Sequence, residues 1–326
     1  MPVTETITEN STLRLNVPPG SFCVVIPTLN AAKDWDSLTS SLLRSARPDQ
    51  VLLIDSESTD GTAKLAAALG FRTVIQPRST FNHGATRQLG VDLCPDAEIL
   101  VYLTQDAILT DESSIPKLIR SFEDPDVSAA YGRQLPRPGA KPIEAHARQF
   151  NYPDRSQKRT LDSRKQLGIR AAFLSNSFAA YRRAALMQVG GFPSSVIFGE
   201  DMVTAARMLL AGYTIAYCAQ ATVYHSHAYS CLQEFRRSFD IGVLHSLENW
   251  LMQEFGSAGG EGKRFVLSEL GYLAQHDRLL LPSSLLRSSL KLTGYRLGRM
   301  HARLPLRWKR RLGMNSAFWR DRPRYF

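Results

Sequence analysis

The chain has 326 residues, of which 44% are hydrophobic and 21% are charged. This is the composition of an ordinary globular protein, and it excludes a disordered or fibrous chain. Lysine and arginine number 40 against 30 aspartate and glutamate, which gives a net charge of +10 at pH 7. The four cysteines have neither the spacing of a zinc site nor that of a disulfide framework, so we expect reduced thiols.

The positive charge is concentrated in the last part of the chain. Residues 287–326 contain twelve basic residues and a single acidic one, Asp321. The rest is almost neutral, which argues against a protein that coats a polyanion with its whole surface. Leucine and tryptophan are interleaved with the arginines, as in an amphipathic helix that lies on an anionic membrane surface. A charged helix packed on the core is the alternative, and we expect no nucleic-acid partner because no recognised nucleic-acid-binding module is present.

Strands and helices are predicted to alternate through the first third of the chain. Continuous apolar, β-branched runs predict buried strands at 22–26, 51–54, 72–75 and 98–103. Apolar periodicity and capping sequences predict helices at 35–46, 63–69 and 83–93. The alternation predicts an α/β fold with a parallel, doubly wound sheet, which binds ligands at the carboxyl ends of its strands.

The pattern is less regular in the second third. A helix is predicted at 113–122 and another at 201–210, with strands at 127–131, 173–181 and 214–217. Residues 132–166 are rich in Pro, Arg, Lys and Gln and lack periodicity, so we predict a long loop with some helix. From Cys231 onward the chain is predicted to be mostly helical.

Acidic residues follow two of the predicted strands. Asp55, Glu57 and Asp60 come after the second strand, where a carboxylate can accept hydrogen bonds from a ribose or a base N–H. Asp60 could equally cap the next helix. Asp106 ends an apolar strand, where an ionised group is costly unless a donor or a cation pairs with it. A divalent metal on a pyrophosphate would supply such a cation.

Two adjacent carboxylates, Glu200 and Asp201, open the helix predicted after residue 200. The helix dipole favours acidic side chains at that end, so a structural role in capping is one interpretation. A pair of carboxylates in a cleft also suits a general base that removes a hydroxyl proton. From the residues alone both interpretations stay open.

Residues 23–30 (CVVIPTLN) and 51–62 (VLLIDSESTDGT) resemble the start of family 2 glycosyltransferases, which have the GT-A fold, a Rossmann-like and mostly parallel sheet with flanking helices. Further pieces agree in order and spacing: 84–90, 177–183, 189–192, 199–201, 211–213 and 223–227. The resemblance divides the chain into a leader (1–20), a glycosyltransferase domain (21–240) and a helical basic region (241–326). Residues 81–87 (FNHGATR) and 103–107 (LTQDA) are similar to the bacterial rhamnosyltransferases of the family.

The resemblance implies roles for individual residues. Asp201 would be the catalytic base with Glu200 beside it, and Asp55 would hydrogen-bond the nucleotide base. Asp106 would be the last acid of the family's Asp-x-Asp motif and would hold Mg²⁺ or Mn²⁺ on the diphosphate, with His225 or His227 as a further ligand. The remaining residues implied for nucleotide-sugar binding are Pro27, Thr28, Asn30, Glu57, Asn82, His83, Arg87 and Gln105.

The chain departs from the family's pattern in the Asp-x-Asp motif, where Thr104 stands at the first acid and Gln105 at the middle position. One carboxylate offers less charge to a cation than two, so metal dependence is open. Either histidine could make a structural hydrogen bond instead, and Arg87 could be a solvated helix cation.

The activity implied is inverting transfer, in which an acceptor hydroxyl attacks the anomeric carbon as the nucleoside diphosphate leaves. The implied donor is dTDP-L-rhamnose, and the acceptor is a bacterial glycan or lipid-linked sugar of lipopolysaccharide, O-antigen or exopolysaccharide synthesis. A UDP- or GDP-sugar donor and a non-catalytic membrane-surface binding protein are the alternatives. Residues 233–237 (QEFRR) lack the Trp of a processive motif, so we expect single-sugar transfer. No apolar run reaches about 18 residues, and the leader is polar. We therefore expect a cytoplasmic protein at the inner face of the cytoplasmic membrane.

Overall fold

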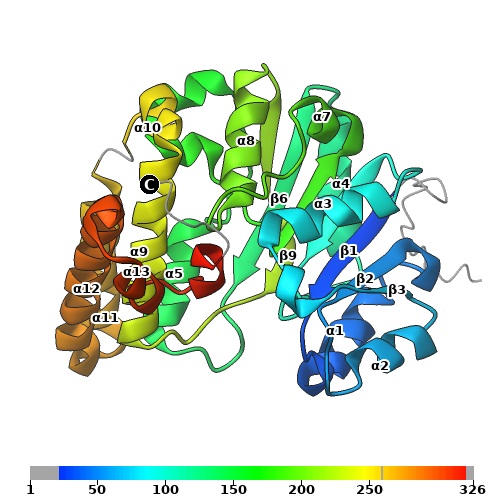
Figure 1. Cartoon of the computed structure of the whole chain (residues 1–326), viewed down its shortest axis with the longest axis horizontal. Coiled ribbons are helices and arrows are strands. Elements are labelled where there is room, and N and C mark those ends of the chain that lie inside the picture. Colours follow the sequence, from blue (N-terminus) through cyan, green and yellow to red (C-terminus); the bar gives the residue numbers. More distant parts are fainter. Residues whose placement is uncertain (1–21, 258–259, 321–326) are drawn as a thin grey trace, which may run out of the picture.

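A computed structural model describes residues 22–257 and 260–320. The predicted leader and the tail residues Asp321, Arg322 and Arg324 lie outside the described residues. The sheet has nine strands in the order β3-β2-β1-β4-β8-β6-β9-β5, with β7 paired to β9 (Figure 1). The strands are β1 (Phe22–Thr28), β2 (Val51–Asp55), β3 (Arg72–Ile75), β4 (Ile99–Leu103), β5 (Ile108–Leu109), β6 (Val127–Leu135), β7 (Gln157–Arg159), β8 (Phe178–Arg182) and β9 (Thr214–Tyr224).

Helices cover both faces of this sheet, and the predicted α/β class is confirmed (Figure 1). Alternate residues of the buried strands enter two separate apolar clusters, one on each face. The helix of residues 83–93 contributes to one cluster, and those of 35–42, 62–68 and 114–119 contribute to the other. The helices of this part are α1 (Trp35–Leu42), α2 (Thr62–Ala68), α3 (His83–Leu93), α4 (Ser114–Ile119), α5 (Pro142–Asn151), α6 (Arg164–Leu167), α7 (Arg183–Gln188) and α8 (Glu200–Leu210).

Strands β3, β2, β1 and β4 are parallel to one another, as the alternating pattern predicted. Strand β8 is different, because it runs antiparallel to both β4 and β6. The strand begins at Phe178, five residues after the start of the strand predicted at 173–181. A 3-10 helix at Gly168–Ala172 precedes it. An apolar run predicts burial but carries no information on direction, which is why the sequence did not reveal this strand's orientation.

Residues 132–166 are not the long loop that the sequence predicted. They contain the end of β6, all of α5, β7 and the beginning of α6. Helix α5 is polar by composition and is held by tertiary contacts: the ring of His146 lies 5.2 Å from that of Phe265, and Phe150 lies 5.1 Å from the same ring. Because those partners lie more than 100 residues away, local periodicity could not reveal the helix.

The last part of the chain is helical, as predicted. Helix α12 crosses α9 at small residues, and a Cβ atom at Gly298 would lie 2.0 Å from the carbonyl oxygen of Phe239. Gly294 makes the same kind of approach to Phe235, at 2.4 Å. None of the helices in 22–257 and 260–320 is both long and apolar enough to cross a membrane. The helices of this region are α9 (Cys231–Leu247), α10 (Asn249–Phe255), α11 (Glu261–His276), α12 (Leu281–Arg299) and α13 (Leu306–Leu312).

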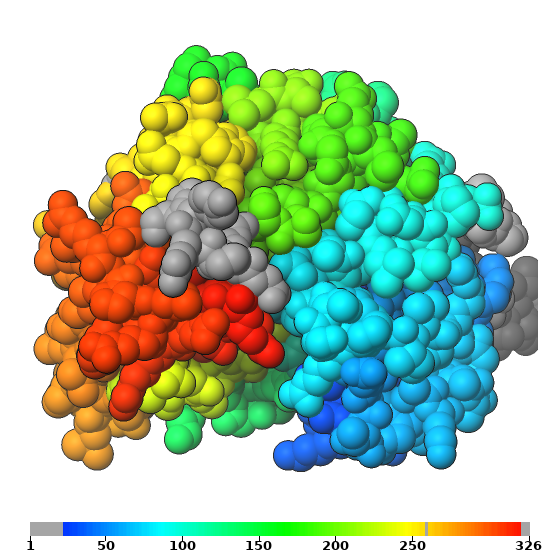
Figure 2. Space-filling view, in the orientation of Figure 1, coloured from blue at the N-terminus to red at the C-terminus, as the bar shows by residue number. Residues whose placement is uncertain are grey.

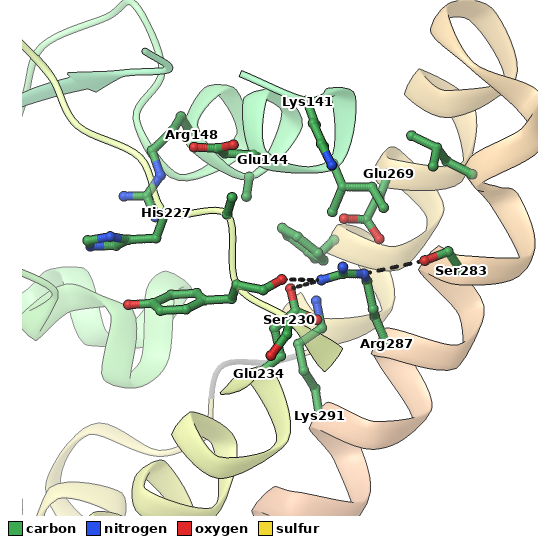
Figure 3. A pocket seen from close by; sticks show the side chains of 16 residues that line it. Lys141, Glu144, Arg148, His227, Ser230, Glu234, Glu269, Ser283, Arg287 and Lys291 are labelled. Carbon is green, nitrogen blue, oxygen red and sulfur yellow. Dashed lines mark hydrogen bonds and ion pairs between the residues drawn. The ribbon is translucent and has the colours of Figure 1, made fainter. Parts of the chain in front are cut away.

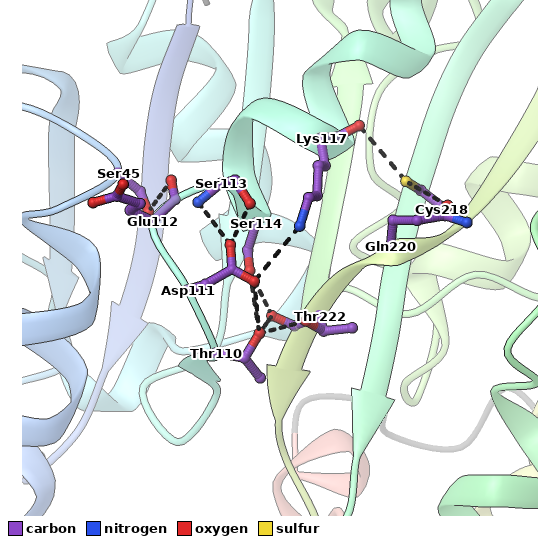
Figure 4. A network of polar contacts seen from close by, with 10 residues as sticks. All are labelled: Ser45, Thr110, Asp111, Glu112, Ser113, Ser114, Lys117, Cys218, Gln220 and Thr222. Atoms are coloured by element: carbon purple, nitrogen blue, oxygen red, sulfur yellow. Dashed lines mark hydrogen bonds and ion pairs between the residues drawn. The ribbon is translucent and has the colours of Figure 1, made fainter. Parts of the chain in front are cut away.

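A polar network joins β5, α4 and β9 just after Asp106 (Figure 4). The Thr110 amide and the Ser114 hydroxyl both donate to the carbonyl oxygen of Thr222, at 3.2 and 2.9 Å. Asp111 accepts from the amide of Ser113 at 2.8 Å and so closes the turn into α4. This pairing places the residues that follow β4 directly beside the end of β9.

The space-filling view shows the two ends of the molecule (Figure 2). The parallel strands and their helices, in blue and cyan, lie on one side, and α11, α12 and α13, in orange and red, lie on the other. The segments between them, which carry β4, β6, β8 and the start of α9, hold most of the predicted site residues.

Candidate active site

The carboxyl end of β2 carries a buried carboxylate whose hydrogen bonds come from nearby residues. Asp55 is 1% exposed and accepts from the hydroxyl of Thr28 at 3.1 Å, the amide of Ser58 at 2.8 Å and the Ser58 hydroxyl at 2.5 Å. Asn30 has a positive φ of 52°, and its side chain accepts from the amide of Thr59 at 2.9 Å. These bonds fix the loops after β1 and β2 against each other before any ligand arrives.

Pro27 lies in the register of β1 and β2 without breaking the sheet. The ladder between β1 and β4 extends only as far as Val25, so no partner on that side needs the amide hydrogen that proline lacks. Pro27, Thr28 and Asn30 therefore lie together at the end of β1, as the resemblance implied.

Gln105 connects the end of β4 to the end of β1. Its side-chain oxygen accepts from the amide of Leu29 at 2.7 Å, and its side-chain nitrogen donates to the Leu29 carbonyl at 3.1 Å. An acidic residue at this position could accept the first bond but could not donate the second. Gln105, at the middle position of the motif, thus joins the two strand ends, whereas Thr104 is the residue that replaces an acid of the Asp-x-Asp pattern.

Asp106, His225 and His227 form a cluster that could hold a metal ion, with one ligand atom of each residue within 4.8 Å of the others. Asp106 Oδ2 lies 3.4 Å from His225 Nε2 and 3.7 Å from His227 Nδ1. Burial opposes ionisation of Asp106, but His225, Thr104 and His227 outweigh it and hold its pKa below the usual value. Burial and the nearby His225 lower the pKa of His227 to about 4, so its ring is neutral at pH 7.

Gln134 orients the buried histidine of this cluster. Its side-chain oxygen lies 2.8 Å from His225 Nδ1 and also accepts from Arg148, while its nitrogen donates to the hydroxyl of Ser175 at 2.9 Å. An amide oxygen can only accept, so Nδ1 carries a proton, and Nε2 is the ring nitrogen that faces Asp106. Metal-binding histidines are commonly held by such a second hydrogen bond. The sequence analysis missed Gln134, which is buried and lies in a segment predicted to be a loop.

Arg87 is not a solvated helix cation. It is 7% exposed, and its guanidinium lies 2.9 Å from Glu200 Oε1. The same Glu200 oxygen accepts from the side chain of Asn176 at 3.1 Å. Burial opposes the ionisation of Glu200, but Arg87 and His83 hold its pKa below the ordinary value. The pair is therefore ionised and fixed.

Asp201 lies beside this ion pair in a different electrostatic environment. Its carboxylate accepts from the amide of Asn176 at 3.2 Å and from the amide of Met202 at 2.8 Å. Burial and the adjacent charge of Glu200 raise the pKa of Asp201 to about 6. A carboxylate with this pKa is ionised at pH 7 yet basic enough to accept a proton, as a general base requires.

The three acids that the sequence singled out lie at one edge of the sheet. The Asp55 loops connect to Gln105 through Leu29, next to Asp106. From Asp106 the contacts run through His225 and Gln134 to Ser175, and the neighbouring Asn176 donates to Asp201. Asn176 is fully buried and was also missed, since nothing in its local sequence distinguishes it.

Three further predicted residues have structural contacts at this edge. Glu57 accepts from the amide of Arg78 at 2.8 Å. Asn82 caps α3 by accepting from the amide of Ala85 at 3.0 Å, and its side chain donates to the Ser194 carbonyl at 3.0 Å. The ring of His83 lies 3.4 Å from Arg87. Contact of these side chains with a nucleotide sugar stays a prediction.

A cavity of about 350 Å³ opens onto the cluster of Asp106, His225 and His227, which we call the metal-type cluster. Asp106, Arg137 and His227 line it together with Tyr229. Arg137 was not among the predicted residues, and its Nη2 atom donates to the Asp106 carbonyl oxygen at 2.5 Å. The cavity thus combines a carboxylate, a neutral imidazole and an arginine, the groups that can bind a metal–diphosphate unit.

The model of the family described as "Glycosyl transferase family 2" matches residues 23–190, from β1 through the end of α7. The chain belongs to glycosyltransferase family 2. It is 43% identical over 300 residues to "O-antigen chain rhamnosyltransferase RfbN" of Salmonella typhimurium, covering 91% of this chain and 96% of the relative. It is 41% identical to "O-antigen chain rhamnosyltransferase WbaN" of Salmonella anatum, covering 92% and 96%.

Solved structures of low sequence identity share the fold of this family 2 glycosyltransferase. The mannosyltransferase PcManGT of Pyrobaculum calidifontis, solved with GDP-Man and Mn²⁺, has a TM-score of 0.54 at 18% identity and covers 92% of this chain and 84% of its own. The structure titled "S. aureus TarS 1-349 in complex with UDP-GlcNAc" has a TM-score of 0.50 at 15% identity, with 87% and 91% covered. The predicted GT-A fold is therefore confirmed.

Proposed function

We propose that this glycosyltransferase moves L-rhamnose from dTDP-L-rhamnose to a hydroxyl group of a bacterial O-antigen precursor. The observation that carries the proposal is the identity of 43% to a Salmonella O-antigen chain rhamnosyltransferase, over nearly the full length of both chains. The similarity covers 91% of this chain and 96% of the relative, which supports a shared activity.

Asp201 would act as the catalytic base. With its pKa raised to about 6 by burial and by Glu200, it accepts the proton of the attacking hydroxyl as the glycosidic bond forms. The hydroxyl attacks the anomeric carbon from the side opposite the leaving diphosphate, so a single displacement inverts that centre. A β-linked L-rhamnosyl donor would then give an α-L-rhamnoside.

The strand ends would hold the donor. Asp55 accepts from Ser58 and Thr28 and retains oxygen lone pairs for a nucleobase N–H. Arg137 lines the same cavity as Asp106 and offers a guanidinium to the diphosphate. Positive charge at this position stabilises the negative charge that grows on the leaving group.

The residues of the metal-type cluster fit a hard divalent cation such as Mg²⁺ or Mn²⁺. Asp106 supplies a carboxylate oxygen, and His225 is fixed by Gln134 with its Nε2 atom towards that carboxylate. His227 is neutral and can offer its Nδ1 atom. When bound, the cation would neutralise charge on the diphosphate leaving group.

The exposed side of the C-terminal helices would lie on an anionic membrane surface, where a lipid-linked acceptor is found. No acidic residue occurs between Asp277 and Asp321. Arginines and apolar side chains are exposed together on α12 and α13, with Leu286 at 55% and Trp308 at 43%. Each cation near such a surface contributes about 1 kcal/mol. We expect co-sedimentation with phosphatidylglycerol vesicles at low salt and none with phosphatidylcholine vesicles; equal binding to both would contradict this part of the proposal.

A donor comparison tests the proposed function. The protein is incubated with Mn²⁺ and, in turn, with dTDP-L-rhamnose, UDP-glucose and GDP-mannose, and its melting temperature is measured. We expect dTDP-L-rhamnose to give the largest rise, and we expect transfer to a membrane-lipid extract of an O-antigen-producing strain to require that donor. A rise with a UDP- or GDP-sugar alone would overturn the rhamnose assignment while leaving the family membership intact.

A further inference from the structure

A second cavity, of about 370 Å³, lies on the other side of the segment that carries His227 (Figure 3). Its walls come from α5, from the start of α9 and from α11 and α12. His227, Ala228 and Tyr229 line both this cavity and the one that contains Asp106. A molecule bound here would therefore lie next to the proposed diphosphate site. The volume of the cavity is in the range of small-molecule sites in proteins.

Charges of both signs face this cavity. Four cationic residues and three acidic residues line it, and Figure 3 shows their side chains around a common space: Lys141, Arg148, Arg287, Lys291, Glu144, Glu234 and Glu269. Arg287 lies 3.1 Å from Glu234 and donates to the Tyr229 carbonyl at 2.8 Å. Within the part of the chain that the structure describes, Lys141 and Lys291 have no ion-pair partner, and neither does Glu144.

Two buried carboxylate oxygens at the cavity wall lack a hydrogen-bond donor. Glu269 is 1% exposed, and Ser284 donates to its Oε2 atom, whereas its Oε1 atom has no hydrogen bond. The closest imidazole nitrogen, that of His146, is 3.9 Å away, which is too far for a hydrogen bond. Glu234 Oε2 is likewise buried without a partner. Leaving buried polar groups unpaired costs free energy, so both oxygens indicate a ligand with donors.

Aromatic surface completes the lining. Tyr229 and Phe265 line the cavity, and the ammonium of Lys291 lies 4.8 Å from the centre of the Phe265 ring. Sugars have apolar ring faces that pack on aromatic rings and hydroxyl groups that both donate and accept hydrogen bonds. A phosphate group, by contrast, only accepts at full ionisation, so it could not donate to the two unpaired carboxylate oxygens.

We propose that this cavity binds an uncharged, hydroxyl-rich sugar unit of the acceptor. The carboxylates of Glu144, Glu234 and Glu269 accept from its hydroxyl groups, and Lys141 and Lys291 donate to them. The proposal rests on the proposed function, because the neighbouring Asp106 cavity is where the activated sugar would lie.

Saturation-transfer NMR with a panel of methyl glycosides tests this assignment. The panel is methyl α-D-mannoside, methyl α-D-galactoside, methyl α-D-glucoside and methyl α-L-rhamnoside, each with the full chain and without metal. We expect at least one glycoside to bind. The double variant Glu144→Gln/Lys291→Met should bind it at least about tenfold more weakly, since hydrogen bonds to charged groups are lost. The matched control Glu112→Gln/Lys263→Met changes exposed residues outside the cavity and should bind it as the parent does.

Two outcomes would overturn the proposal. The first is that the cavity variant melts at the same temperature as the control variant, yet gives the same glycoside signals as the parent protein. The other is that inorganic pyrophosphate binds and that its binding is lost in the same variant, which would make this an anion site. The melting-temperature rise with dTDP-L-rhamnose is measured on all three proteins. If that rise is missing while glycoside binding still depends on the cavity, the donor assignment fails and the sugar site stands.

Discussion

The candidate site has a strand-end side, at the ends of β1 and β2, and a helical side, at the cavity between α5, α11 and α12. The carboxylates of these two sides differ in how they are hydrogen-bonded. At the ends of β1 and β2, Asp55 receives its hydrogen bonds from Thr28, the last residue of β1, and from Ser58, in the loop after β2. In the cavity between α5, α11 and α12, Glu234 and Glu269 each keep a buried oxygen without a donor. Both oxygens of Asp55 already accept hydrogen bonds without a ligand, whereas one oxygen each of Glu234 and Glu269 accepts none. This contrast indicates that donor recognition is pre-formed, whereas the acceptor supplies part of its own site.

Asp201 is the proposed catalytic base, and its loss is expected to have the largest effect. Asp201→Asn keeps the shape but cannot accept a proton, so turnover should fall by about 10²–10⁴-fold while donor binding is retained. Turnover is measured as nucleoside diphosphate release, and donor binding as the rise in melting temperature. Asp162→Asn, at an exposed residue paired with Lys165, is the control. Undiminished turnover in Asp201→Asn would remove this residue from the mechanism.

A substitution at the crossing of α9 and α12 separates the stability of the helical side from that of the strand ends. In Gly298→Ala the new methyl group meets the backbone of Phe239, so the helices must move apart, which should cost about 1–3 kcal/mol in the free energy of unfolding. Urea denaturation gives this value. Gly271→Ala, on α11 with open space around its Cβ, should instead gain up to about 1 kcal/mol. Equal stability of the two variants would show that the close crossing is not maintained in solution.

The metal-type cluster can be weakened without touching its proposed ligands. Gln134→Met removes the acceptor of His225 Nδ1, so the ring is no longer held in one tautomer and orientation. We expect Mn²⁺ to bind about 10–100-fold more weakly, as measured by electron paramagnetic resonance. Gln253→Met, at an exposed position on α10, should leave Mn²⁺ binding unchanged. An unchanged affinity in Gln134→Met would mean that His225 does not hold the ion.

The smallest expected effect is a shift of the pH profile. In the parent protein, activity should rise with pH through about 6, where Asp201 loses its proton and becomes able to act as a base. Glu200→Gln removes the neighbouring charge that raises the pKa of Asp201 and frees the positive charge of Arg87, and both changes lower that pKa. The rising limb should therefore move to lower pH. The control is Glu98→Gln, which removes the ion pair between Glu98 and Arg182. If the rising limb moved to higher pH in Glu200→Gln, its assignment to Asp201 would be contradicted.

Much of the strand-end side could be predicted because its signals are local. Apolar runs gave β1, β2, β3 and β4 to within a few residues, and α3 has the predicted bounds. Parallel strands bring their carboxyl ends to one edge, so the strand pattern alone places Asp55 and Asp106 at the same edge of the sheet. The residues alone left the role of Asp201 open between capping and catalysis, and the family's motifs favoured the catalytic role.

Only the tertiary structure decided how these residues are used. The antiparallel β8, the pairing of β5 with β9 that brings His225 to Asp106, and the burial of Arg87 against Glu200 all join segments far apart along the chain. Their free energy comes from packing and charge pairing between distant residues, and a one-dimensional pattern does not record such partners. For the same reason, the sequence determined the sheet and the acids of the site, while the cavity between α5, α11 and α12 exists only once those helices have packed.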